Sequence, residues 1–279
     1  MRCIVATGPD DVHDETTVPT LTPSETLGRV VEFFRAHTAR IAAVGVACFG
    51  PVDLDPGSAT FGRITTTPKP GWAGTDVVGA LRALALPIAF DTDVNGAALG
   101  EHRWGAGRGV EPFVYVTVGT GIGGGVVVGG RPVHGLVHPE MGHVPIPRDA
   151  DDGFAGVCPY HRGCLEGLAS GVALRARWGA APETLPADHA AWPRQARYLA
   201  LGICAMTAIL SPPRIALGGG VMRAPGLLER VRGEVAAALA GYIRAPELVP
   251  PSLGERAGVL GAVALAQSTL DAREYNNAR

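Results

Sequence analysis

The most specific spacing in the sequence is Cys158-x2-His161-x2-Cys164, with His143 a short distance upstream. Thiolate and imidazole groups are the ligands that zinc prefers in closed tetrahedral sites, and two-residue gaps let a tight turn direct neighbouring ligands to one point. The alternative is two free thiols and two surface histidines on a loop. Because this segment is irregular and poor in aliphatic side chains, it needs a cross-link. We therefore predict a structural Zn²⁺ with four protein ligands and no open position for a metal-bound water.

Two glycine-rich segments each follow a short apolar run. The first is 119–125, where glycines let backbone N–H groups approach a phosphate and Thr120 adds a hydroxyl donor. A tight β-hairpin is the alternative for this segment. The second is 218–220, which follows the apolar run 214–217. We expect the two turns to lie on separate halves of the protein and to hold the two ends of a nucleotide across a cleft.

Carboxylates cluster in two further places. Asp91, Asp93 and Asn95 lie where an apolar run meets a predicted helix. An Asp in this position serves as a helix cap, or as a base that accepts a proton from a substrate hydroxyl. Glu140 and Glu166 flank the predicted metal ligands, so they are either solvated surface groups or acceptors for the vicinal hydroxyls of a sugar. Phosphoryl transfer needs little more than such a base, a phosphate-binding turn and Mg²⁺.

Short apolar runs bounded by Gly or Asp predict the elements that position these residues. We expect strands at 42–49, 87–90, 113–118, 124–128 and 214–217, and helices at 24–34, 95–103, 196–210, 227–243 and 256–266. Alternating strands and helices in two halves predict an α/β fold with two similar lobes. We place the lobes at 1–105 and 106–279, with the zinc loop 143–164 in the second and an irregular excursion at 145–165.

Bulk composition excludes several classes of protein. The chain has 279 residues, 47% of them hydrophobic, and a net charge of −2, which argues against nucleic acid as a partner. Apolar stretches fall short of the ~20 residues needed to span a membrane. An odd count of 5 cysteines argues against a disulfide framework, so we expect a cytoplasmic protein in which Cys3, Cys48 and Cys204 fill the core. We expect 271–279 to be a polar, mobile tail.

Together these segments resemble the ROK family of sugar kinases, and within it the bacterial fructokinases. The resemblance runs from about Arg2 to Ala266. It is carried by CFGPVD, TTTPKPGW, DTDVNGAALGE, GTGIGGG, HPEMGH, CPYHRGCLEGLASG and LGGGVM. It implies an actin-like (ribonuclease H-like) two-lobed ATPase fold, Mg-ATP as phosphoryl donor, Zn²⁺, and a homodimer.

The resemblance also implies a role for individual residues. Asp93 would be the general base that takes the proton from the sugar hydroxyl. The sugar would be held by Asn95, Glu140, His143 and Glu166, and the metal by His143, Cys158, His161 and Cys164. The ATP phosphates would meet Thr120, Gly121 and Gly123, and the adenosine end would meet Gly218, Gly219 and Gly220.

One departure concerns the N-terminus. ROK kinases open with a strand that ends in an Asp-x-Gly-Gly-Thr-Lys-type turn, which cradles the transferred phosphate and helps to place Mg²⁺. Here Cys3 to Ala6 matches the strand after that turn, so the first strand is absent from this chain. We expect a start codon placed too late, or a truncated gene. A chain of this kind would bind sugar and zinc but transfer phosphate poorly.

Three functions remain open at this point. The first is an ATP-dependent fructokinase. The second is a non-catalytic sugar-binding or regulatory relative, although the chain has no room for a helix-turn-helix before Ser24. The third is a kinase for glucose, mannose or N-acetylmannosamine. Only the resemblance of TTTPKPGW and CPYHRGC favours fructose.

Overall fold

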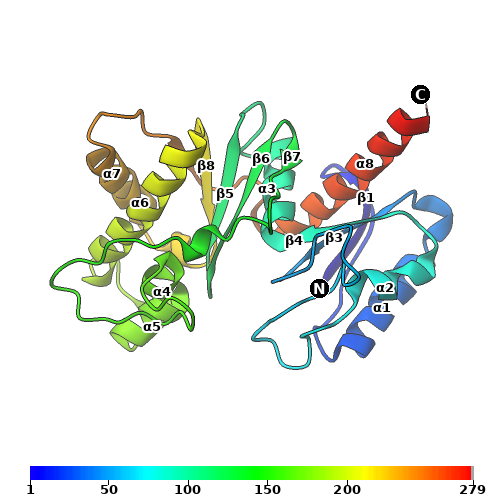
Figure 1. Cartoon of the computed structure of the whole chain (residues 1–279), viewed down its shortest axis with the longest axis horizontal. Helices are drawn as coiled ribbons and strands as arrows, with labels where there is room; N and C mark the ends of the chain where they lie inside the picture. The colour runs from blue at the N-terminus through cyan, green and yellow to red at the C-terminus, as the bar shows by residue number, and fades with distance from the viewer. Residues whose placement is uncertain (278–279) are drawn as a thin grey trace.

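The computed structural model describes the chain from Met1 to Asn277, with side chains through Asp271. Two α/β lobes lie side by side, with helices α3 (Asp93–Trp104) and α8 (Ala257–Asn277) between them (Figure 1). These helices cross at glycines, because a Cβ on Gly261 would lie only 1.7 Å from the carbonyl oxygen of Gly96. The predicted two-lobed α/β arrangement is confirmed.

The first lobe contains two separate pairs of strands. The antiparallel pair is β1 (Arg2–Gly8) with β2 (Asp11–Thr17), and the parallel pair is β3 (Val44–Cys48) with β4 (Ile88–Thr92). Helices α1 (Pro23–Arg35) and α2 (Val77–Leu81) pack on this lobe. Helix α1 begins where predicted, because the Thr22 hydroxyl accepts the Glu25 N–H and a proline occupies the first turn.

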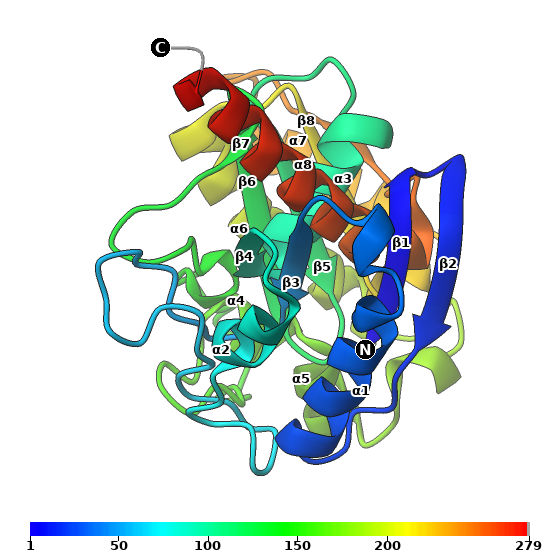
Figure 2. The same cartoon turned by 90° about the vertical axis from the view of Figure 1, so that its right-hand side faces the viewer.

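A cavity of about 540 Å³ lies between the two strand pairs. Its walls are β1, β3 and one side of α8, and Asp93 reaches its edge. Within the described residues, β1 pairs only with β2 and β3 only with β4, so the strand edges of β1 and β3 toward this cavity carry no sheet partner. Figure 2 shows the β1–β2 hairpin standing apart from β3.

The second lobe is built on a five-stranded sheet of order β7-β6-β5-β8-β9. Antiparallel β6 and parallel β8 flank the central strand β5, so segments about a hundred residues apart lie side by side. The strands are β5 (Phe113–Val118), β6 (Ile122–Val128), β7 (Arg131–Pro132), β8 (Arg214–Gly218) and β9 (Glu247–Val249). The helices are α4 (Leu165–Ala169), α5 (Gly171–Trp178), α6 (Ala191–Leu210) and α7 (Leu227–Leu239).

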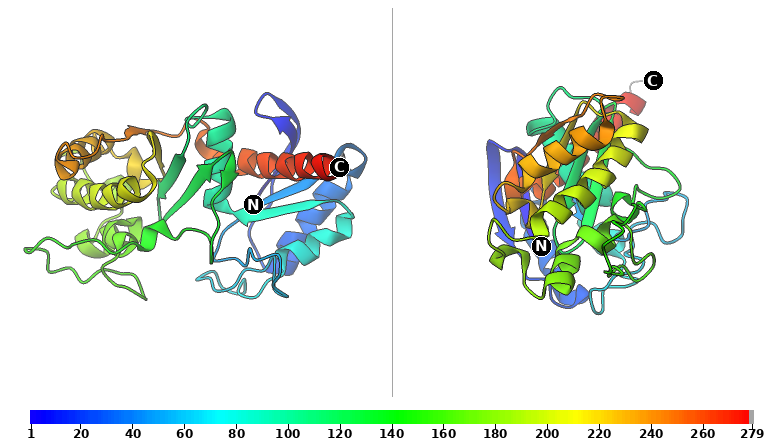
Figure 3. Two further views of the ribbon diagram at one scale, coloured as in Figure 1. Left: turned by 45° about the horizontal axis from the view of Figure 1, so that its top comes forward. Right: turned by 90° about the vertical axis from the view of Figure 1, so that its left-hand side faces the viewer.

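The structure differs from the sequence-based expectation at the C-terminus. The segment 271–277, expected to be a mobile tail, continues helix α8 through Asn277, while residues 278–279 lie outside the described part. Helix α8 was also assigned to the second lobe, yet it returns to pack on β1, β3 and β4 of the first (Figure 3). The apolar face of α8 is buried by this packing against the first lobe. The local sequence does not reveal which lobe the helix packs on.

Strand β2 was not predicted at all. Its sequence DVHDETT lacks an apolar face because nearly every residue of this edge strand is exposed. In the described part of the chain, no helix is both long and apolar enough to cross a membrane.

Glu101 of α3 binds the segment that precedes α8, and this contact generates a prediction. Its carboxylate is fully buried and accepts three backbone N–H groups: Ala106 at 2.7 Å, Ser252 at 3.0 Å and Leu253 at 2.7 Å. The change Glu101→Gln replaces one acceptor oxygen with a donor that faces these N–H groups. We expect the free energy of unfolding to fall by about 1–3 kcal/mol, measured by urea unfolding followed by tryptophan fluorescence. The exposed Glu183→Gln is the matched control, and equal midpoints for the two variants would contradict this role.

Candidate functional site

The site is organised around the junction of β4 and α3. Asp91, the next-to-last residue of β4, is 2% exposed and accepts the Thr92 N–H and the Asn95 Nδ2–H, each at 2.7 Å. His134 Nε2 lies 2.9 Å from the second carboxylate oxygen, and this bond raises the pKa of His134. The Thr92 hydroxyl then caps α3 by accepting the Asn95 N–H at 3.1 Å. These bonds fix the direction in which the next residue, Asp93, leaves the strand.

Asp93 is the one carboxylate of this junction with an accessible side chain. It occupies a concavity, and desolvation by the surrounding protein raises its pKa above the ordinary aspartate value. The bond from the Val94 N–H to its Oδ1, at 2.9 Å, and the charge of His138 oppose that rise, whereas the charge of Glu140 adds to it. A carboxylate with a raised pKa and no fixed cation partner is suited to accept a proton.

Glu140 is held by a buried histidine. His138 is 7% exposed, and its Nε2 lies 2.9 Å from Glu140 Oε1. This bond lowers the pKa of Glu140, so the carboxylate stays ionised and acts as a hydrogen-bond acceptor. His138 Nδ1 is buried without a hydrogen-bond partner among the described residues.

Glu166 connects the glycine turn to the cysteine-histidine cluster. Its Oε2 accepts the Ile122 N–H at 2.9 Å, at the start of β6, and its Oε1 lies 3.9 Å from His143 Nε2. A Cβ on Gly121 would come within 2.5 Å of that Oε2. The glycine is therefore required for the carboxylate to reach the turn.

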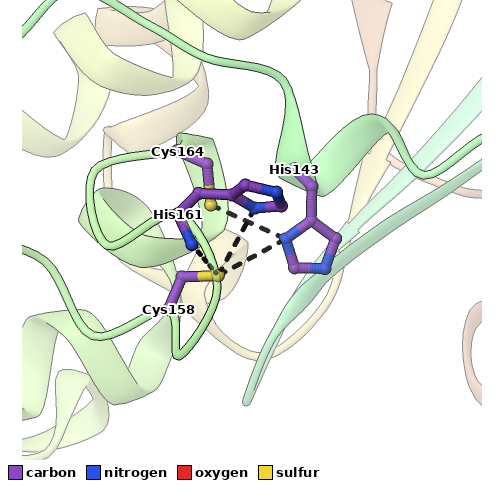
Figure 4. Close-up of side chains that lie close together, drawn as sticks. All are labelled: His143, Cys158, His161 and Cys164. Atoms are coloured by element: carbon purple, nitrogen blue, oxygen red, sulfur yellow. Dashed lines mark hydrogen bonds between the residues drawn. The ribbon is translucent and has the colours of Figure 1, made fainter.

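The four predicted metal ligands converge, as Figure 4 shows. His143, Cys158, His161 and Cys164 each direct one ligand atom to a common point, and these atoms lie within 4.8 Å of one another. His143 Nδ1 lies 3.6 Å from both sulfurs, and His161 Nδ1 lies 3.7 Å from Cys158 Sγ. In addition, the His161 and Gly167 backbone N–H groups donate to the two sulfurs.

This geometry fits a zinc-type site. Sulfur at about 2.3 Å and nitrogen at about 2.0–2.1 Å from a tetrahedral ion stand about 3.6 Å apart, close to the distances found here. Backbone N–H groups that donate to the sulfurs are the outer-shell contacts that stabilise thiolates. His143 uses only Nδ1 in this cluster, which leaves Nε2 to face Glu166.

The two glycine turns lie next to each other, not on separate halves as expected. Strand β5 ends in the first turn and β8 in the second, and Thr117 pairs with Gly218 in the parallel ladder. Gly219 has φ +94, and a Cβ there would lie 2.3 Å from the Val118 carbonyl oxygen, so only glycine allows this approach. Both turns therefore open at one edge of the second-lobe sheet.

The first turn is a β-hairpin, yet its tip remains accessible. The Gly119 N–H donates to the Gly121 carbonyl at 2.8 Å, and Thr120 is exposed. Gly123 lies inside β6, where a Cβ would meet Val94 at 2.9 Å. Gly123 thus packs against Val94, the residue that follows Asp93, and only a small residue fits there. This contact brings the first glycine turn close to the Asp93 carboxylate.

The structure separates the predicted site residues into two groups. Asp93, Glu140, His143 and Glu166 gather near the first turn, whereas Asn95 is fully buried with its amide bonded to Asp91. Sequence reasoning missed His134 and His138 as partners of carboxylates. Their proximity to HPEMGH was the available signal, but only the fold shows which carboxylate each histidine meets.

Comparison with known proteins shows extended similarity. The family model described as ROK family matches residues 1–269. The fructokinase of Zymomonas mobilis is 49% identical over 261 residues, which cover 89% of this chain and 87% of that protein. The fructokinase of Pediococcus pentosaceus is 39% identical over 276 residues, covering 96% of this chain and 95% of that one.

Solved structures include a similar fold. The ROK hexokinase from Thermus thermophilus superposes with a TM-score of 0.78 at 29% identity, covering 97% of this chain and 99% of that chain.

Proposed function

Because the chain belongs to the ROK family and has the actin-like fold of its sugar kinases, we propose that it transfers the γ-phosphoryl group of ATP to a hexose, with fructose as the preferred substrate. The observation that carries this proposal is Asp93, an accessible carboxylate with a raised pKa beside a glycine turn. The fructokinase names of the similar proteins support the choice of sugar.

Asp93 acts as the base in this reaction. Its carboxylate accepts the proton of the sugar hydroxyl as the hydroxyl oxygen attacks the γ-phosphorus of ATP. The new P–O bond forms while the bond to the leaving ADP oxygen breaks. Mg²⁺ bound with ATP would supply positive charge to the phosphates. Asp91 cannot take this role, because it is buried and already bonded on both oxygens.

Glu140, Glu166 and His143 form the proposed sugar pocket. Ionised carboxylates accept hydrogen bonds from sugar hydroxyls, and both glutamates are anchored by other groups before any sugar arrives. Such pre-organisation reduces the entropy lost on binding. Asn95 is left out of this set because its side chain is buried.

The glycine turns form the proposed nucleotide site. Thr120 and Gly121 offer donors to the phosphates, while 218–220 faces the adenosine end from the neighbouring strand. Adjacent turns on one sheet edge suit a single extended nucleotide, with its phosphates directed toward Asp93.

Zn²⁺ is the metal proposed for the four-ligand cluster. His143, Cys158, His161 and Cys164 would hold the ion, which would cross-link the segment 143–164 and would have no catalytic role, because four protein ligands complete a tetrahedron. By holding His143 Nδ1, the cluster keeps Nε2 directed at Glu166.

We propose that the cavity between β1 and β3 is the place of one further strand. A further strand with an Asp-x-Gly-Gly-Thr-Lys-type turn would fill it, pair with both strand edges and end beside Asp93. The homodimer and the cytoplasmic location remain proposals based on the family resemblance.

Removal of the proposed base gives the first kinetic prediction. Asp93→Asn should lower kcat by about 10²–10⁴-fold with little change in the KM for fructose. Because Asp93 must be ionised and its pKa is raised, kcat/KM should fall as pH drops through a value above that of an ordinary aspartate. A coupled ADP-release assay across pH and across fructose, glucose, mannose and N-acetylmannosamine measures both effects. Exposed Asp188→Asn is the control, and a D93N enzyme with normal turnover would exclude this mechanism.

Metal content gives the second prediction. Purified protein should contain one zinc per chain by elemental analysis, and Cys158→Ser or Cys164→Ser should abolish it. Strong chelator should lower Tm by about 10 °C, since an ion present at a thousandfold excess over its Kd adds about 4 kcal/mol. Cys204→Ala, remote from the cluster, should retain both zinc and Tm. Protein that lacks zinc and is indifferent to chelator would refute the assignment.

The cavity gives the third prediction. A strand with the Asp-x-Gly-Gly-Thr-Lys turn, fused ahead of Met1, should raise kcat by on the order of 10²–10³-fold, because it adds pre-organised phosphate donors. The same extension with its turn residues scrambled is the matched control. If the unextended chain already turns over as fast as the extended one, the proposal is wrong.

A further inference from the structure

Lys69 is the only lysine of the chain, since every other member of its 24 Lys and Arg residues is an arginine. An ammonium is a compact charge with three donors that rotate freely, whereas a guanidinium is a planar fork that suits fixed bidentate partners. Position 69 thus differs in chemistry from every other basic side chain in the sequence. It lies in TTTPKPGW, a segment to which the reaction described above assigns no role.

Aromatic side chains hold the lysine in place. Its Nζ lies 4.4 Å from the centroid of the Phe49 ring, and Phe49 meets Trp72 edge-on at a centroid distance of 5.4 Å. Trp72 is 1% exposed, and its indole N–H donates to the Leu21 carbonyl at 3.0 Å. The exposed ammonium is therefore carried by a loop that is anchored in the core of the first lobe.

Strand register places Lys69 near the proposed base. Cys48 lies opposite Thr92 in the parallel pair of β3 and β4. The next residues along the chain, Phe49 and Asp93, therefore follow the two strands at the same edge of the pair. The ammonium thus lies over the ring of the residue that follows β3, at the strand edge from which Asp93 also departs.

The Cys48 thiol is consistent with this placement. Burial, and after it the charge of Asp93, raise the pKa of this thiol to about 12, while the charge of Lys69 acts in the opposite direction. Both charges therefore lie close enough to the same thiol to act on it.

Charge balance indicates what the ammonium binds. Among the described residues it contacts a ring and forms no ion pair with a carboxylate. Asp93, Glu140 and Glu166 make the site negative, which repels an entering triphosphate. A neutral sugar needs no cation for binding, whereas a phosphoryl group does. Resting on the proposed kinase function, we propose that Lys69 is a catalytic residue that contacts the phosphoryl group during transfer and binds the phosphate of the sugar phosphate product.

The step is balanced without further reagents. Asp93 takes the hydroxyl proton, the sugar oxygen bonds to phosphorus, and ADP leaves with the electrons of the broken P–O bond. Lys69 donates hydrogen bonds to the peripheral phosphoryl oxygens and keeps its proton throughout. The dianionic sugar phosphate then remains paired with the ammonium until it is released.

Product affinity tests this role without requiring turnover. In calorimetric titrations, Lys69→Met should weaken fructose 6-phosphate binding by about 10- to 100-fold, the range for a lost charge-assisted hydrogen bond, and leave fructose binding unchanged. Lys69→Arg, which keeps the positive charge, should lose less affinity for fructose 6-phosphate than Lys69→Met. Arg63→Met, which removes a cation of the same lobe paired with Asp76 at 3.5 Å, should bind both ligands as the parent does.

The single lysine permits a second test on the unaltered chain. Acetic anhydride should modify Lys69 and the Met1 amine, and peptide mass spectrometry separates the two. Fructose 6-phosphate should slow acetylation of Lys69 but not of Met1, and fructose should protect neither. Equal protection by both ligands, or K69M that binds product normally, overturns the proposal. If neither ligand binds the parent protein, the proposed sugar kinase function fails as well.

Discussion

The buried Asp91 carboxylate is the constraint on which the rest of the site depends. A charge removed from water is tolerated only when it is fully paired, and here a backbone N–H, the Asn95 amide and His134 provide the partners. His134 follows β7 of the second lobe, whereas Asp91 belongs to β4 of the first. One hydrogen-bonded group therefore sets the direction of α3, presents Asp93 and joins the sheets of the two lobes.

A second chain of contacts extends from the cysteine-histidine cluster to the glycine turn. His143 faces the cluster with Nδ1 and Glu166 with Nε2, and Glu166 accepts the Ile122 N–H. Any group that fixes the His143 ring therefore also restricts the Glu166 carboxylate and Ile122, the first residue after the turn. A cross-link at this cluster would therefore fix the geometry of the proposed sugar pocket through His143, which belongs to both.

Local pattern predicted most elements, but not the contacts between them. The strand at 113–118 was found exactly because its apolar run is bounded on both sides, and the Cys158–Cys164 spacing located a cluster that the fold assembles. The adjacency of β5 and β8 was missed because parallel pairing across about a hundred residues leaves no local trace. For the same reason Asp91 and Asp93 looked equivalent in sequence, and only their burial separates them.

The surroundings of these carboxylates differ in charge as well as in burial. Asp91 is neutralised by His134, whose own pKa it raises, and Glu140 has a pKa lowered by His138, so both act as fixed acceptors. Asp93 has no such partner, and desolvation raises its pKa instead. When the pKa values of two carboxylates in one site are shifted in opposite directions, as for Asp93 and Glu140, the carboxylate with the raised pKa is the one suited to take a proton. His134 and His138, which pair with Asp91 and Glu140, therefore contribute to the choice of Asp93 as the proposed base as much as the residues around Asp93 do.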